Sequence, residues 1–402
     1  MGRSDGPQPK QAAAFTQPTR MLALATVGFT ISFWAWALLA PLGPTLRQEL
    51  NLTSLQQSLV VAVPVIVGSL GRIPIGAITD RVGARRMFPL VVALTILPVL
   101  YLGHLADSLA EVLASGFLLG LAGTTFTIGV PFVNAWYPPG RRGLALGLFG
   151  LGGLGTAISG FTTVQLADAA GRSFPFDLVA TLLAAYALTA SLLLHDKPER
   201  PVTTGSVLAR AATALRMPAT LQLALLYAVA FGGFVAFSVY LPTYLTTAYG
   251  LGRSDAAART AGFVMLAIAM RPVGGWLSDR THPVPVLTGA YAALSALALV
   301  AALEPPLIPI GTIAFLGMAA ALGAAGGAVF ALVARLIPPE RVGSVTGVVG
   351  AAGGMGGFFP PLVMGTIHSA VHDYTWGFVL LAITAAATSA FTAISVRRRA
   401  TR

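Results

Sequence analysis

Twelve long apolar runs follow one another through most of the chain, separated by short polar segments. Each is close to the roughly 20 residues that a helix needs to cross a bilayer. Hydrophobic residues make up 55% of the sequence and charged residues only 10%, too few charges to cover a water-facing surface. Because helices satisfy their own backbone in lipid, the sequence predicts an all-α membrane protein with 12 transmembrane helices. We place them at residues 21–43, 57–79, 87–106, 110–136, 144–167, 175–195, 219–248, 257–277, 283–303, 306–335, 343–369 and 375–396.

The second half of the chain repeats part of the first. The repeated residues lie about half the chain length apart and pair as Arg72 with Arg271, Gly76 with Gly275, Asp80 with Asp279, and Arg81 with Arg280. Such a repeat is typical of transporters built from two rocking bundles. We therefore expect two six-helix pseudo-repeats, an N-terminal half at 21–195 and a C-terminal half at 219–396, joined by a cytoplasmic linker at 196–218.

The basic residues predict how the chain sits in the membrane. Most of the 25 lysines and arginines fall in alternate segments that include both termini, and basic segments stay on the cytoplasmic side. We expect a multi-pass protein of the cell membrane, with a disordered cytoplasmic tail at 1–20 and a basic cytoplasmic tail at 397–402. The net charge of +11 is explained by this topology, so we predict no nucleic-acid partner.

Two arginines lie inside apolar runs. Arg72 precedes Asp80, at the end of its run, by eight residues, which places it roughly 12 Å into a core about 30 Å thick. Arg271 has the same relation to Asp279. A buried arginine costs roughly 2.5–3.5 kcal/mol even on the mild insertion scale and is functional by default. No acidic residue lies at this depth, so a visiting oxyanion is the simplest counter-ion. The alternative is that each arginine binds carbonyl groups and waters, or extends its charge to the interface.

Glycine-rich stretches lie within two of the predicted spans. They begin at Gly147 and at Gly347 and include Gly153 and Gly353. Small residues let membrane helices pack closely, which is one interpretation. The other is that bare backbone also lines the path of the anion.

A cluster of charged residues follows the second apolar run, at residues 80–86, and part of it is repeated after the eighth run, at residues 279–280. Asp80 could pair with arginines or with a helix N-terminus, as a latch for one conformation, and Asp279 is placed in the same way. The alternative is simple anchoring of the topology. The candidate latch residues are Gly76, Asp80, Arg81, Arg85, Arg86, Asp279 and Arg280.

Few other side chains suggest chemistry. Tyr227 is the best aromatic candidate because its hydroxyl can donate to an anion, with Phe126 and Phe231 beside the path. The chain has no cysteine, and neither lysine lies in a glycine-rich phosphate loop. No histidine falls clearly at mid-membrane. We expect no metal, no cofactor and no enzymatic activity.

The charged cluster, with its echo in the second half, resembles the signature of the major facilitator superfamily. More narrowly, the chain resembles the nitrate/nitrite porter family. The residues that carry this likeness are Arg72, Arg271 with Pro272-Val273-Gly274-Gly275, Gly123-Thr124-Thr125-Phe126, Leu226-Tyr227 with Phe231, and the run Gly353-Gly354-Met355-Gly356-Gly357-Phe358-Phe359-Pro360. The resemblance implies the major facilitator fold, with Arg72 and Arg271 clamping the anion and Tyr227 and Phe126 shaping the pocket.

These observations together predict a secondary transporter of a small inorganic oxyanion, most simply nitrate or nitrite. The anion would be held between Arg72 and Arg271 during alternating access, Gly123, Gly153 and Gly353 would border the site, and a monomer would suffice. The lack of a buried carboxylate at this depth favours anion exchange, an antiporter, over proton symport. Alternatives are an exporter or importer of another organic anion or a drug-like compound, and a membrane receptor without transport activity.

Overall fold

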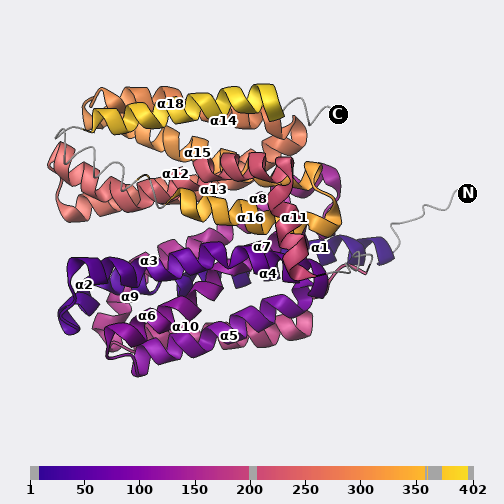
Figure 1. Ribbon diagram of the computed structural model, residues 1–402, viewed down its shortest axis with the longest axis horizontal. Coiled ribbons are helices and arrows are strands. Elements are labelled where there is room, and N and C mark those ends of the chain that lie inside the picture. Colours follow the sequence, from indigo (N-terminus) through magenta and orange to yellow (C-terminus); the bar gives the residue numbers. More distant parts are fainter. Residues whose placement is uncertain (1–8, 199–205, 358–359, 361–373, 397–402) are drawn as a thin grey trace, which may run out of the picture.

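The computed structural model describes residues 9–198, 206–357, 360 and 374–396, and their regular secondary structure is entirely helical (Figure 1). The elements of the N-terminal half are α1 (Pro9–Trp36), α2 (Leu39–Glu49), α3 (Ser54–Leu70), α4 (Arg72–Val82), α5 (Ala84–His104), α6 (Leu109–Leu119), η1 (Gly120–Thr124), α7 (Thr125–Trp136), η2 (Pro139–Arg141), α8 (Arg142–Phe149), η3 (Gly150–Gly153), α9 (Leu154–Ala170) and α10 (Phe174–Leu193). A helix of the linker, α11 (Val207–Arg216), follows.

The C-terminal half has longer uninterrupted helices. Its elements are α12 (Pro218–Tyr249), α13 (Arg253–Arg280), α14 (Pro283–Ala302), η4 (Leu307–Gly311), α15 (Thr312–Leu336), η5 (Pro339–Arg341), α16 (Val342–Gly356), α18 (Thr375–Phe391) and η6 (Thr392–Val396). In Figure 1 most of the helices up to α10 form one bundle and those from α12 onward form a second, and the two meet along a seam, where α8 packs against α13 and α15 of the second bundle.

Within the described residues, eleven helical segments are long and apolar enough to cross a membrane. They confirm the prediction of an all-α membrane protein. The run expected at 343–369 begins with α16, and its residues 358–359 and 361–369 lie outside the described part of the chain, as do the tail at 397–402 and residues 1–8.

The N-terminal boundary differs from the expected one. We expected a disordered tail over residues 1–20, but α1 already begins at Pro9. Proline is favoured in a first helical turn, and the alanines at positions 12–14 are the strongest helix formers.

Three of the N-terminal spans are interrupted near mid-length. Gly71 separates α3 from α4, η1 separates α6 from α7, and η3 separates α8 from α9. Tight 3₁₀ turns inside longer helices often mark functional positions, and irregular backbone at membrane depth is tolerated where protein surrounds it. Two of them, η1 and η3, offer a backbone carbonyl group to Arg72 and to Arg271, respectively.

The two bundles approach most closely through glycines. A Cβ atom on Gly76 of α4 would overlap the carbonyl oxygen of Gly343 of α16, and one on Gly275 of α13 would overlap that of Gly143 of α8. Only residues without a side chain allow these backbones to meet. Both contacts lie at the end of the molecule where α4 joins α5 and α13 joins α14; we call this the basic end, since Arg81 and Arg280 lie there.

Candidate anion site

Arg72 is the first residue of α4, and its side chain is enclosed by both halves. The residue is only 1% exposed. Its Nε donates to the carbonyl oxygen of Gly123 at 3.1 Å and its Nη1 to that of Gly350 at 2.7 Å. The guanidinium carbon lies 5.8 Å from the ring centre of Phe126 and 5.9 Å from that of Phe231.

Arg271 has an equivalent position in α13. It is 7% exposed, and its Nη1 donates to the carbonyl oxygen of Gly150 at 3.1 Å. Its guanidinium carbon lies 5.4 Å from the ring centre of Phe231 and 5.2 Å from that of Phe234. Each arginine therefore reaches a carbonyl of the opposite half, and both lie against the ring of Phe231.

The protein supplies neither arginine with a carboxylate partner among the described residues, whose ion pairs all lie elsewhere. The carbonyl contacts that the alternative interpretation expected are present. A guanidinium has five N–H donors, however, and toward the described residues Arg72 uses two and Arg271 one. Both cations thus keep N–H donors for a ligand, and both side chains are almost completely buried.

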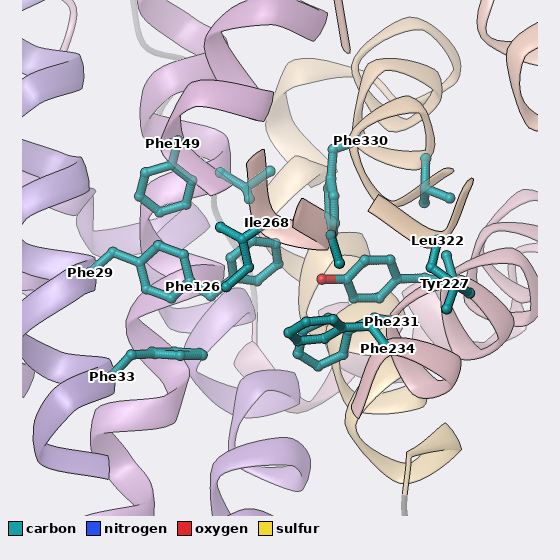
Figure 2. Close-up of a cluster of buried hydrophobic side chains, with 14 of the residues drawn as sticks. Phe29, Phe33, Phe126, Phe149, Tyr227, Phe231, Phe234, Ile268, Leu322 and Phe330 are labelled. Carbon is teal, nitrogen blue, oxygen red and sulfur yellow. The ribbon is translucent and has the colours of Figure 1, made fainter. Parts of the chain in front are cut away.

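Aromatic rings connect the two halves at the level of the arginines. Tyr227 stacks on Phe126 with ring centres 6.3 Å apart, and on Phe231 at 5.2 Å. Figure 2 shows the Tyr227 hydroxyl pointing across the seam toward Phe126. The edge of Phe330 closes the layer, 4.8 Å from Tyr227 and 4.9 Å from Phe126.

Sequence analysis missed two members of this layer. Phe234 lies seven residues after Tyr227, and Phe231 lies four after it, so all three share one face of α12; that spacing could have identified Phe234. Phe330 of α15 had no such signal, because its partners come from other helices.

The glycines near the site act in different ways. Gly123 contributes its carbonyl, while Gly153 and Gly353 give room: a Cβ at Gly153 would lie 3.2 Å from Nη1 of Arg271, and one at Gly353 would overlap the ring of Tyr227. Gly150 and Gly350 were not among the predicted site residues, although their carbonyls bind the two arginines. Which carbonyl an arginine meets depends on how the helices cross.

Asp80 links the end of α4 to the start of α16. Its Oδ1 accepts from the N–H of Gly343 at 2.8 Å, and its Oδ2 accepts from the N–H of Ser344 at 2.7 Å and from the hydroxyl of Ser344 at 2.5 Å. Arg210 of α11 adds an ion pair at 3.2 Å. A carboxylate at a helix N-terminus is favoured by the unpaired N–H groups and the helix dipole.

Asp279 makes the matching connection from α13 to α8. Its two oxygens accept from the N–H groups of Gly143 at 2.9 Å and Leu144 at 2.8 Å. Each half therefore places a carboxylate on a helix N-terminus of the other half, beside the Gly76 and Gly275 contacts. Both connections hold the seam closed at the basic end.

The basic members of the predicted latch lie on the surface. Arg81, Arg85, Arg86 and Arg280 are exposed, and the backbone N–H of Arg85 donates to Asp196. Arg280 lies over the ring of Trp276 at 4.4 Å. The ion-pair partner of Asp80 at 3.2 Å is instead Arg210, which sequence analysis did not single out because the linker's position is a tertiary property.

Solved structures of other proteins share this architecture at low sequence identity. A human organic anion transporter, MFSD10, superposes with a TM-score of 0.79 at 14% identity, covering 93% of this chain and 99% of that one. The Escherichia coli fucose:proton symporter FucP gives 0.75 at 18% identity, covering 94% and 98%. At this identity the likeness concerns the fold alone.

The sequence itself identifies the family. The model of the Major Facilitator Superfamily matches residues 25–361. A probable nitrate/nitrite transporter of Mycobacterium tuberculosis, NarK2, is 47% identical over 379 residues, 94% of this chain and 96% of that protein. A nitrite extrusion protein of Bacillus subtilis is 36% identical, covering 90% of each chain. The chain therefore belongs to the major facilitator superfamily and, within it, to the family of these nitrate and nitrite transporters.

Proposed function

We propose that this protein carries nitrate or nitrite across the cell membrane, with the anion held between Arg72 and Arg271. The observation that carries the proposal is the pair of buried arginines, one from each half, without a carboxylate partner in the described chain. A planar guanidinium fork suits a small planar oxyanion. The names of the relatives, a nitrate/nitrite transporter and a nitrite extrusion protein, agree with this cargo.

The closed seam suggests how access alternates. By the positive-inside rule, the basic end faces the cytoplasm, so the observed arrangement is closed on that side. Opening it requires Asp80 to leave the N-terminus of α16 and Asp279 to leave that of α8. The two connections then act as latches, and the anion reaches the cytoplasm once both have parted. Since one chain supplies both arginines, a monomer has a complete site.

The charge of the site favours exchange of one anion for another. Two permanent cations in a buried seam are costly unless an anion accompanies them. A carrier that returns loaded with nitrite after delivering nitrate avoids that cost. We therefore expect the protein to be an antiporter of the two anions.

The test uses purified protein in proteoliposomes. Arg72→Lys and Arg271→Lys keep the charge but lose the planar fork, so each should raise the KM for nitrate by at least roughly tenfold, the effect of one charged hydrogen bond. Arg259→Lys is the matched control on α13, since Arg259 pairs with Asp255 outside the site. Nitrate uptake by both variants with the wild-type KM would refute the arginine site.

A further inference from the structure

A short run of threonines borders the carbonyl that holds Arg72. In Gly123-Thr124-Thr125-Phe126-Thr127, the hydroxyl of Thr124 donates to the carbonyl of Leu121 at 2.7 Å and that of Thr125 to the carbonyl of Ala122 at 2.8 Å. The hydroxyl of Thr127 has no hydrogen-bond partner in the described chain, although the residue is completely buried. Thr127 thus departs from its neighbours.

The acceptor that Thr127 would ordinarily use is already taken. A threonine in a helix commonly donates to the carbonyl four residues earlier, as Thr79 does to Ile75 at 2.7 Å and Thr95 to Val91 at 2.8 Å. For Thr127 that carbonyl belongs to Gly123. In this structure it accepts the Nε of Arg72 at 3.1 Å.

The unpaired hydroxyl lies beside the arginine that displaces it. A Cβ atom on Gly350 would lie 3.0 Å from Cδ of Arg72, 3.6 Å from its Nη1 and 3.7 Å from the hydroxyl oxygen of Thr127. The guanidinium group of Arg72, the hydroxyl of Thr127 and the backbone of Gly350 therefore lie close together. The Gly123 carbonyl, four residues earlier, is the acceptor that a rotated Thr127 side chain would use in the helix.

We propose that Thr127 is a positioning residue for anion binding, because its hydroxyl replaces Arg72 on the Gly123 carbonyl when the anion draws the guanidinium away. This inference rests on the proposed function. Before binding, Arg72 donates to Gly123 and the Thr127 hydroxyl is unpaired. After binding, the Nε of Arg72 is free for the anion and Thr127 donates to Gly123.

The exchange matters because a buried carbonyl without a donor is costly. Without the hydroxyl, drawing Arg72 toward the anion would take a donor from the Gly123 carbonyl without replacing it, and the lost hydrogen bond would be subtracted from the binding energy. When the hydroxyl is present, the unfavourable free energy of an unpaired group falls instead on the protein without anion, where the Thr127 hydroxyl is unpaired. Thr127 therefore weakens the empty state and favours the loaded one.

The device serves only one of the two arginines. The repeat has shifts of 199 and 200 residues on either side of this segment, and these pair Thr127 with Gly326 or Gly327, neither of which has a hydroxyl. Among the described residues Arg271 donates to one carbonyl, that of Gly150, whereas Arg72 donates to two. Arg72, which makes more carbonyl contacts, is therefore the arginine with a neighbouring hydroxyl that can replace it on its carbonyl.

The experiment compares Thr127→Val with Thr127→Ser, using sodium nitrate as the probe and measuring both thermal unfolding and nitrate affinity. Thr127→Val should keep or raise the unfolding temperature without nitrate, because it removes an unpaired buried hydroxyl. It should reduce the stabilisation by nitrate and raise the Kd roughly five- to tenfold, with transport at saturating nitrate little changed. Thr127→Ser should restore the wild-type affinity.

Thr346→Val is the matched control. Thr346 of α16 is also fully buried with an unpaired hydroxyl, but no arginine holds the carbonyl four residues before it in the described chain, so its loss should leave nitrate affinity unchanged. The inference would be overturned if Thr127→Val binds nitrate with wild-type affinity, or if Thr346→Val loses as much affinity as Thr127→Val. It would also be overturned if Thr127→Val without nitrate unfolds at a lower temperature than the wild type and Thr127→Ser does not restore that temperature. Absence of any nitrate effect on the wild-type protein would instead refute the proposed function.

Discussion

At the scale of single residues, the candidate site combines two permanently charged arginines with glycines, which have no side chain. Arg72 and Arg271 supply the positive charge, and glycines decide where it can lie, because a Cβ atom on Gly350 or on Gly150 would press against the Cδ of the arginine that each of them binds. The two repeats differ in detail, however. Gly353 makes room for the ring of Tyr227, whereas its counterpart Gly153 faces the end of the Arg271 side chain.

This difference predicts unequal effects of adding one methyl group. Gly353→Ala would overlap the ring of Tyr227, which is held between Phe126 and Phe231. Overpacking of this kind costs about 1–3 kcal/mol, so we expect nitrate affinity to fall roughly tenfold or more. Gly153→Ala meets the flexible end of Arg271 at 3.2 Å and should have a smaller effect.

Isothermal titration with nitrate would measure both changes. Gly160→Ala in α9 is the control, because nothing lies within 4 Å of the added methyl group. Equal losses in Gly153→Ala and Gly353→Ala would contradict the assignment of Tyr227 to the site.

At the scale of helices, the contacts between two helix C-terminal ends and two helix N-terminal ends decide whether the seam is closed. α4 is joined to α16 by Asp80, and α13 to α8 by Asp279. The first connection is the stronger on chemical grounds, since Asp80 accepts from two backbone N–H groups, one hydroxyl and Arg210, while Asp279 accepts from two backbone N–H groups. Hydrogen bonds to a charged group contribute about 1.5–3 kcal/mol each.

Removing either charge should loosen the basic end. We expect Asp80→Asn to expose the seam more than Asp279→Asn does, by a factor of roughly ten in labelling rate, which corresponds to about 1.4 kcal/mol. The chain has no cysteine, so a single reporter, Ala331→Cys, can be labelled with a maleimide. Ala331 is 3% exposed and faces Gly143 across the seam.

Asp255→Asn provides the comparison, because Asp255 pairs with Arg259 on the surface. Labelling that stays at the background rate in both seam variants would show that the glycine contacts alone hold the basic end closed.

At the scale of the molecule, two bundles share one site that neither could form alone. Each arginine belongs to one half and donates to a carbonyl of the other, so any movement of one bundle against the other rearranges both contacts together. The aromatic layer of Phe126, Tyr227 and Phe231 also crosses the seam. In the proposed mechanism, anion binding and opening of the seam are thereby coupled through the same few residues.

Exchange between two anions is the expected consequence. Nitrite inside proteoliposomes should accelerate nitrate uptake by at least roughly fivefold over empty vesicles, since an unaccompanied return leaves two cations unpaired in the seam. An imposed pH gradient should have little effect. Uptake of labelled nitrate, with and without internal nitrite, would measure this; uptake that follows the pH gradient and ignores internal nitrite would identify a proton symporter instead.

The sequence by itself determined the class of fold and the two charges around which the site forms. Run length and apolar composition are local properties, and they predicted the helices; the repeat predicted two halves; the depth of Arg72 and Arg271 in their runs predicted that both are buried. Tertiary structure alone decided which groups these residues meet. The carbonyls of Gly150 and Gly350, the ring of Phe330 and the ion pair from Arg210 come from distant segments, and their positions depend on how packed helices cross, which no local pattern of residues specifies.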